Sequence, residues 1–197
     1  MSRADLRADL QASLHDAASV LDEPGDLDRC LNAAAEDFGR FCPRTRAATL
    51  ALTAGLGEYP APADLLGFKS STWADGRAQP WEKAHPGRLP RVTNEDGILL
   101  FSPPPSAHQI AVLGASFRYF YFAGHAVGDT AETTTVPASL RALLILRAQA
   151  EACRELAARA VAMPVTLRDG ISGQPRNGTP AYLFEKLMAE FREKAVR

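Results

Sequence analysis

The sequence predicts an α+β fold in which a helical hairpin and a long helix pack with a small antiparallel β-sheet, followed by a tethered C-terminal helix. Apolar residues recur every three or four positions over residues 5–41 and 138–162, which is the period of amphipathic helices. Over residues 45–123 the period changes to two and turn residues interrupt it, as in short strands. A segment of linker composition then separates a last helical pattern, residues 179–197, from everything before it.

The helical hairpin is predicted from two amphipathic segments joined by a short turn. The first covers residues 5–22 and the second residues 26–41, and each has a single apolar face. The Pro-Gly pair at positions 24–25 breaks the pattern between them, which favours two antiparallel helices. The longest helix is predicted over residues 138–162, and its apolar surface is broad enough to need cover from its own domain or from a neighbour.

Short strands are predicted between the hairpin and the long helix. They cover residues 47–53, 65–72, 97–101, 109–113 and 116–123. The intervening residues 73–97 carry several prolines and are expected to form a long surface loop, packed down by Trp73 and Trp81. Residues 116–123 place aromatic rings on both faces, so we expect this strand to be central or covered on both sides.

The last helix differs from the others in its context. Residues 1–163 are expected to complete the core, and residues 164–178 have the composition of a flexible linker. Because an amphipathic helix on a linker is then not needed for the core, residues 179–197 are expected to dock on a partner. The docking side of this helix consists of Tyr182, Leu183, Phe184, Leu187, Met188 and Phe191.

The composition is that of a globular protein that is not built to hold nucleic acid. Of its 197 residues, 46% are hydrophobic and 23% charged, and a formal net charge of −1 offers no basic face for gripping phosphates. No stretch approaches the roughly 20 apolar residues that span a bilayer, and residues 1–5 do not start a signal peptide. Cys30, Cys42 and Cys153 lack metal-ligand spacing and suit a reducing compartment. We therefore expect a soluble intracellular protein without membrane contact.

Local catalytic motifs are absent from the sequence, and we predict no catalytic residue, metal ligand or cofactor. His125 with Asp129 nearby is the one hint of an acid–base pair, and a surface histidine at a strand end is the simpler interpretation. Cys42 is interpreted as a structural thiol. The aromatic run at residues 117–122 is typical of a base-stacking sheet as well as of a core strand, and we favour the core because Arg118 alone flanks it.

Three segments carry a family resemblance: Leu-Asn-Ala-Ala-Ala-Glu-Asp-Phe at residues 31–38, the strand and Tyr-Pro-Ala-Pro-Ala-Asp corner within residues 47–66, and the Pro-started, Ala/Leu/Arg-rich helix at residues 136–151. Together they resemble the adaptor, or head–tail connector, proteins of tailed bacteriophages, prophages and related gene transfer agents. The long Trp/Pro loop and the prolines at positions 60 and 62 depart from the family pattern, which leaves the local sheet geometry open.

The resemblance implies a non-enzymatic structural protein in the neck of a virion or gene-transfer particle, assembled in the bacterial cytoplasm. The subunit would form a ring, usually a dodecamer, beneath the portal protein, and would receive the next neck, stopper or tail protein. DNA would pass through the lumen, and the last helix would bind the portal. Candidate subunit–subunit contacts are the apolar positions Leu6, Leu10, Leu14, Leu140 and Leu144.

Three alternatives stay open at this point. Another neck or tail-completion protein, a stopper or terminator, would be dominated by β-structure. A small hydrolase would need His125, Asp129 and a serine or cysteine to converge in one pocket. A regulatory module would use its last helix to dock in a receptor groove.

Overall fold

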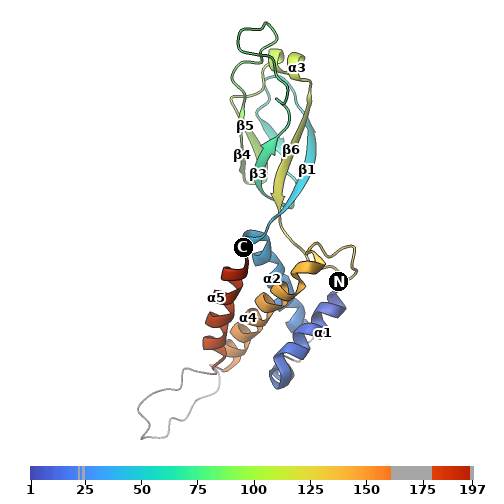
Figure 1. Cartoon of the computed structure of the whole chain (residues 1–197), viewed down its shortest axis with the longest axis vertical. Coiled ribbons are helices and arrows are strands. Elements are labelled where there is room, and N and C mark those ends of the chain that lie inside the picture. The colour runs from blue at the N-terminus through green and yellow to red at the C-terminus, as the bar shows by residue number, and fades with distance from the viewer. Residues whose placement is uncertain (22, 24, 161–178, 196–197) are drawn as a thin grey trace, which may run out of the picture. The chain divides into compact units, whose positions relative to one another are not determined.

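The computed structural model describes residues 1–21, 23, 25–160 and 179–195, and it divides the chain into two compact units (Figure 1). The helical unit comprises Met1–Cys42 and His125–Arg197, and the β unit comprises Pro43–Gly124. The α+β class is confirmed, but the helices and the strands have separate cores instead of the single core predicted over residues 1–163. The predicted linker at residues 164–178 lies outside the described residues.

The helical unit contains α1 (Arg3–Leu14), α2 (Asp26–Phe41), α4 (Arg141–Ala160) and α5 (Pro180–Ala195), with 3-10 turns at His15–Val20 and Ala138–Leu140. The side chain of Ser2 starts α1 by accepting a hydrogen bond from the Asp5 amide at 3.2 Å. The single helix predicted over residues 5–22 is wrong in its second half. His15 has a φ of 50°, which lies in the left-handed region and ends the α-helix after Leu14.

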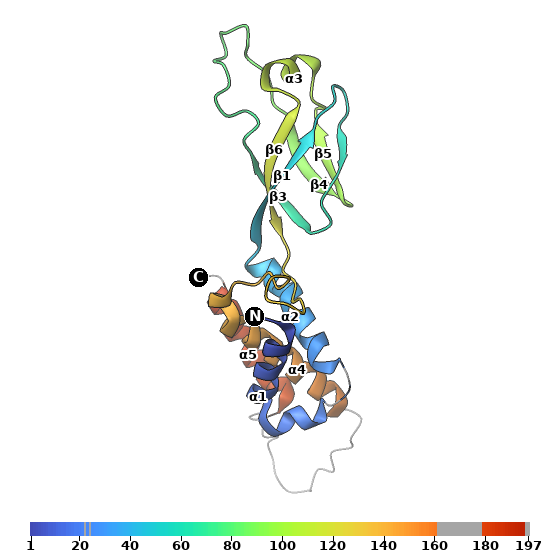
Figure 2. The same cartoon turned by 90° about the vertical axis from the view of Figure 1, so that its right-hand side faces the viewer.

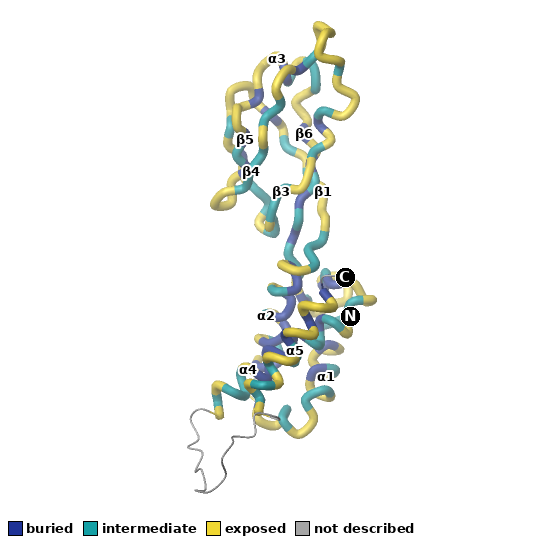
Figure 3. The backbone as a smooth tube through the Cα atoms, turned by 60° about the vertical axis from the view of Figure 1, so that its left-hand side comes forward, coloured by how far each residue is buried: buried dark blue, intermediate teal, exposed yellow. Residues whose placement is uncertain are grey.

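The core of the helical unit is built where α1, α2, α4 and α5 face one another. Leu10, Leu31, Phe38, Leu144 and Phe191 have no exposed surface. Figure 3 shows the resulting buried stripes along α2 and α4. Each such side chain stabilises the unit by about 1.5–3 kcal/mol through apolar burial, so these positions account for the helical periodicity seen in the sequence.

Asp26 is a buried carboxylate at the start of α2, and none of its side chain is exposed. It accepts a hydrogen bond of 2.7 Å from Nη2 of Arg159, and Arg29 pairs with its other oxygen. Burial opposes the charge, but the hydrogen bond and charge of Arg159, together with Arg29, outweigh it and lower the pKa of Asp26. The pair ties the start of α2 to the end of α4.

The lowered pKa of Asp26 makes the stability of the helical unit sensitive to acid. The ionised carboxylate stabilises the folded state above the unfolded pKa, and this contribution is lost as the pH falls through the folded pKa. Asp26→Asn is therefore expected to be less stable than wild type at neutral pH, and the difference should shrink below about pH 4. Urea unfolding at a series of pH values measures it, with the exposed Asp16→Asn as control. A difference that persists unchanged in acid would contradict the assignment.

The β unit consists of two antiparallel sheets of three strands, which lie in two layers (Figure 2). The first sheet has the order β1 (Arg44–Ala51), β6 (Ser116–Ala123), β3 (Leu65–Ser71), and the second has the order β2 (Glu58–Pro60), β5 (Ile98–Ser102), β4 (Arg91–Glu95). A short helix, α3 (Ala107–Leu113), precedes β6. Alternate residues of both sheets meet in one aromatic core, in which the rings of Phe101 and Phe117 lie 5.0 Å apart.

The structure confirms that the aromatic strand is central, because β6 pairs with β1 along its whole length and with β3 on its other side. Phe117, Tyr119 and Tyr121 are buried between the layers. Phe120 and Phe122 point away from the other layer and are only half-buried. The second face of β6 is therefore open in the described chain.

Two local predictions in the β region are wrong. Residues 109–113, predicted as a strand, form part of α3, because Ser106 and Gln109 make reciprocal hydrogen bonds that cap a helix. The predicted loop at residues 73–97 includes the strand β4. Its two tryptophans also differ. The Trp73 indole donates a hydrogen bond to the Gly114 carbonyl at 2.8 Å, whereas Trp81 is 80% exposed and does not hold the loop against the β unit.

Candidate interaction surfaces

His125 and Asp129 do not form an acid–base pair. Nε2 of His125 lies 3.0 Å from the carbonyl of Cys42, which can only accept, and Nδ1 lies 3.2 Å from Oγ1 of Thr135. The Asp129 side chain is 92% exposed and pairs with Arg3 at 3.2 Å. Because both imidazole nitrogens are engaged and the carboxylate faces another residue, these two residues do not form the reacting centre that the hydrolase alternative requires of them.

The cysteines are not activated as nucleophiles. Burial, with Glu151 nearby, raises the pKa of Cys30 to about 11, and burial also raises the pKa of Cys42 and Cys153. The Cys42 thiol instead donates to the carbonyl of Ala195 at 3.2 Å. In the ranges that the structure describes, no group of His, Cys, Asp or Glu has the arrangement of a metal site.

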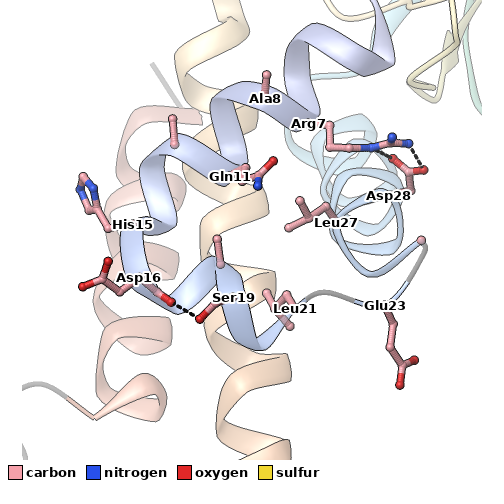
Figure 4. A pocket seen from close by; sticks show the side chains of 13 residues that line it. Arg7, Ala8, Gln11, His15, Asp16, Ser19, Leu21, Glu23, Leu27 and Asp28 are labelled. Atoms are coloured by element: carbon pink, nitrogen blue, oxygen red, sulfur yellow. Dashed lines mark hydrogen bonds and ion pairs between the residues drawn. The ribbon is translucent and has the colours of Figure 1, made fainter.

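A hollow of about 1320 Å³ opens on the helical unit where α1, the following 3-10 turn and α2 meet. Figure 4 shows Arg7 paired with Asp28 on one side, with 3.1 Å between Nε and Oδ1, and His15 on the opposite side. The residues that line the hollow between these two sides include Ala8, Gln11 and Ala12 of α1. Since the charged groups do not converge on one point, this hollow has the chemistry of a packing surface and not of a catalytic site.

Comparison with known proteins identifies the family. A family model described as SU10 adaptor protein matches residues 1–165. The chain belongs to the SU10 adaptor protein family. This is a family of phage head–tail adaptors, so the chain is a structural component of a virion and assembles with other virion proteins. No match was found among curated proteins.

The family match confirms the resemblance inferred from the three sequence segments, and it covers the whole β unit of the adaptor. It ends before α5, which begins at Pro180. The family match therefore carries no information about the last helix. Among the adaptor helices that the structure describes, none is long and apolar enough to cross a membrane.

The structure places most of the predicted subunit-contact leucines inside the adaptor's own helical core. Leu6, Leu10 and Leu144 have no exposed surface, so in this conformation they stabilise their own subunit and offer nothing to a neighbour. Leu14 and Leu140 are partly buried against the same core. Subunit contact through these five residues stays a prediction, and only Leu14 and Leu140 keep surface for it.

The prediction that the last helix is not needed for the core is wrong for its second half. Met188, Phe191 and Ala195 are buried in the helical unit, and the Phe191 ring lies 5.4 Å from the ring of Phe41. The predicted start is confirmed, because Oγ1 of Thr179 accepts a hydrogen bond of 3.3 Å from the Tyr182 amide. The other predicted docking residues differ from these: Tyr182, Phe184 and Leu187 are half-buried, and Leu183 is 43% exposed.

Sequence reasoning missed a basic residue beside the aromatic strand. Lys69 of β3 reaches across β6, where its Nζ lies 5.3 Å from the centre of the Phe122 ring and donates to Oγ1 of Thr45 at 3.0 Å. A register shift between Phe68 and Ser70 accompanies this placement. Nothing in the local sequence of β3 signals the shift, so only the strand pairing reveals the contact.

Proposed function

We propose that the adaptor forms a ring beneath the portal, joins the portal to the next neck or tail protein, and lets DNA pass through its lumen. The family match over residues 1–165 carries this proposal. The formal net charge of −1 supports passage of DNA without retention, because affinity for phosphates rises with each basic contact. Helices make up much of the described chain. This content argues against the stopper or terminator alternative, which would be dominated by β-structure.

We infer that α5 provides the portal contact while it stays on its own subunit. Detaching α5 would expose Met188 and Phe191, at a cost of about 3–6 kcal/mol in lost apolar burial. Leu183 and Leu187, one turn apart, already present an apolar flank without any detachment. The exposed flank is thus the surface that a partner reaches at the lowest free-energy cost.

Binding of purified portal rings to the full chain tests this inference. Leu183→Asp, which changes an exposed position, is expected to weaken portal binding by about tenfold or more while the helical unit stays folded. Ala189→Asp, at an exposed position on a different side of α5, is the matched control and should bind as wild type.

A chain stopped at residue 170 lacks α5 and is expected to lose portal binding in the same co-sedimentation assay. Because this truncation also uncovers the core around Phe38, circular dichroism must accompany it. If the truncated chain and Leu183→Asp both bind portal rings with wild-type affinity, α5 is not the portal contact.

A further inference from the structure

The β unit has two outer faces, one on each side of its aromatic core. Side chains alternate along each strand. Tyr59 and Leu99 of the second sheet and Phe117 of the first point toward each other, so the neighbouring residues on each strand point outward. The structure describes every residue of this unit, and both outer faces are open within it. Their charges are opposite in sign.

The basic face is the outer side of the sheet β1-β6-β3 and is defined by Lys69, Arg118, Phe120 and Phe122. Lys69 lies over the ring of Phe122, and Cζ of Arg118 lies 5.8 Å from the centre of the Phe120 ring. Small residues surround the pair of rings: Thr45, Ala47, Thr49 and Ser70 are all exposed. No outward position of these three fully described strands carries an acidic side chain, so the face is positive with an aromatic centre.

The acidic face is the outer side of the sheet β2-β5-β4 and is defined by Glu58, Glu95, Ile98 and Leu100. Glu58 is the partner of Leu100 across the β2–β5 pair, and Glu95 is the partner of Ile98 across the β5–β4 pair. Arg91 also lies on this face, at its end, opposite Ser102. Its single positive charge leaves the net charge of the face negative.

A hollow opens at the β2 edge of the acidic face. Its volume is about 440 Å³, and Leu56, Glu58 and Leu100 are among its lining residues. Leu56 is 45% exposed and forms an apolar wall. An acidic rim on an apolar hollow suits a side chain with an apolar stem and a cationic end, such as arginine or lysine.

We propose that the basic face of one copy docks on the acidic face of the next copy, so that the β units form a head-to-tail contact around the ring. This inference rests on the proposed function, which supplies the ring. The two faces lie on opposite sides of one unit, which is the requirement for a heterologous interface that repeats from subunit to subunit. Arg118 and Lys69 then meet Glu58 and Glu95 around an apolar centre.

The dimensions of the two faces are compatible. Glu58 and Glu95 are two strands apart and displaced by two residues along the strands, a separation of about 12 Å, and Arg118 lies four residues from the ring that Lys69 covers, a separation of about 13 Å. The long lysine and arginine side chains can adjust over the remaining difference. Like faces would repel each other, so the contact favours head-to-tail over face-to-face pairing.

A second copy fits the basic face better than nucleic acid does. Phe120 and Phe122 are half-buried and already covered by the two cations, so their rings are not free to stack on bases. Two cations also make few phosphate contacts. The acidic face, by contrast, is a partner of matching chemistry that every copy carries.

Charge reversal in the full chain tests the contact. The basic-face variant carries Lys69→Glu and Arg118→Glu, and the acidic-face variant carries Glu58→Lys and Glu95→Lys. Sedimentation velocity over a concentration series is expected to show self-association of wild type and an association constant lowered about tenfold or more in either variant. Lys83→Glu, an exposed lysine on the loop between β3 and β4, is the matched control and should associate as wild type.

Rescue separates a lost contact from a lost fold. An equimolar mixture of the two variants restores opposite charges at every contact if the copies alternate, and a chain carrying all four changes restores them in a single species. Both are expected to self-associate again. Failure of both rescues, unchanged association of the single-face variants, or a wild-type chain that stays monomeric up to its solubility limit overturns the proposal.

Portal binding, measured in parallel, keeps this inference apart from the proposed function. Variants that bind portal rings and self-associate like wild type overturn the head-to-tail contact and leave the adaptor role intact. A wild-type chain that neither self-associates nor binds portal rings overturns both the head-to-tail contact and the proposed adaptor function. An oligonucleotide that binds to wild type but not to the basic-face variant, while self-association is the same in both, would assign the basic face to nucleic acid. This result would overturn the second-copy proposal.

Discussion

Arg147→Met is expected to lower the unfolding free energy of the helical unit by about 3–5 kcal/mol, because it leaves a buried carboxylate without its main partner. The Arg147 side chain is only 6% exposed, and its Nη1 and Nη2 each lie 3.1 Å from Oε2 of Glu151, which is 8% exposed. Its Nε also donates to Asp37 of α2 at 3.0 Å. One guanidinium thus joins α2 and α4 at two carboxylates.

The cause of this loss can be separated from side-chain packing. Methionine keeps most of the volume of the arginine stem, so the expected effect comes from Oε2 of the buried Glu151, which loses both of its hydrogen bonds while only the exposed Arg154 still pairs with the other oxygen. Arg147→Met with Glu151→Met removes both charges and should recover most of the stability. Arg154→Met changes an arginine that also pairs with Glu151 but is 65% exposed, and it should cost less than about 1 kcal/mol. Urea unfolding followed by circular dichroism measures all three, and a double variant no more stable than the single one would contradict the explanation.

Phe191→Ala is expected to destabilise the helical unit by a similar amount, about 3–5 kcal/mol, and to loosen α5. The Phe191 ring is fully buried and lies 6.2 Å from the ring of Phe38 and 5.4 Å from that of Phe41. Removing it leaves a cavity at the point where α5 meets α2. Hydrogen exchange of α5 amides should therefore become much faster, while amides of the β unit keep their wild-type rates.

Leu183→Ala is the matched control on the same helix. Leu183 is 43% exposed, so truncating it removes little buried area and should change the unfolding free energy by less than about 1 kcal/mol. Equal destabilisation by the two variants would show that the two ends of α5 are buried alike, against the structure. The pair also complements the portal assay, because Leu183 is assigned to the partner and Phe191 to the subunit's own core.

The helices were predictable because their signals are local. Ser2 and Thr179 cap α1 and α5, and both caps lie directly before an apolar stripe. The strand β6 was predictable for the same reason, since its alternation of buried and exposed residues is visible over eight consecutive positions. In each case the residues that determine the element lie close to one another in the sequence.

One of the two missed elements had a local signal, and the other is defined by its strand pairing. The cap of α3 is the Ser-x-x-Gln pattern of Ser106 and Gln109, which is visible in the sequence, and the Gln109 side-chain amide also donates to the distant Arg88 carbonyl at 2.7 Å. The strand β4 exists because it pairs with β5, with Val92 opposite Phe101. Neither partner can be named from the local pattern, because pairing is decided by which surfaces the rest of the fold brings together.

By itself the sequence determined the class of fold, the positions of the long helices and the aromatic strand, and the family to which the adaptor belongs. Only the tertiary structure decided that helices and strands have separate cores, that Phe191 serves its own subunit, and that Lys69 joins Arg118 on one face. The reason is physical. Periodicity shows that a residue needs cover, but which surface covers it depends on packing and strand register between segments that are distant in the chain.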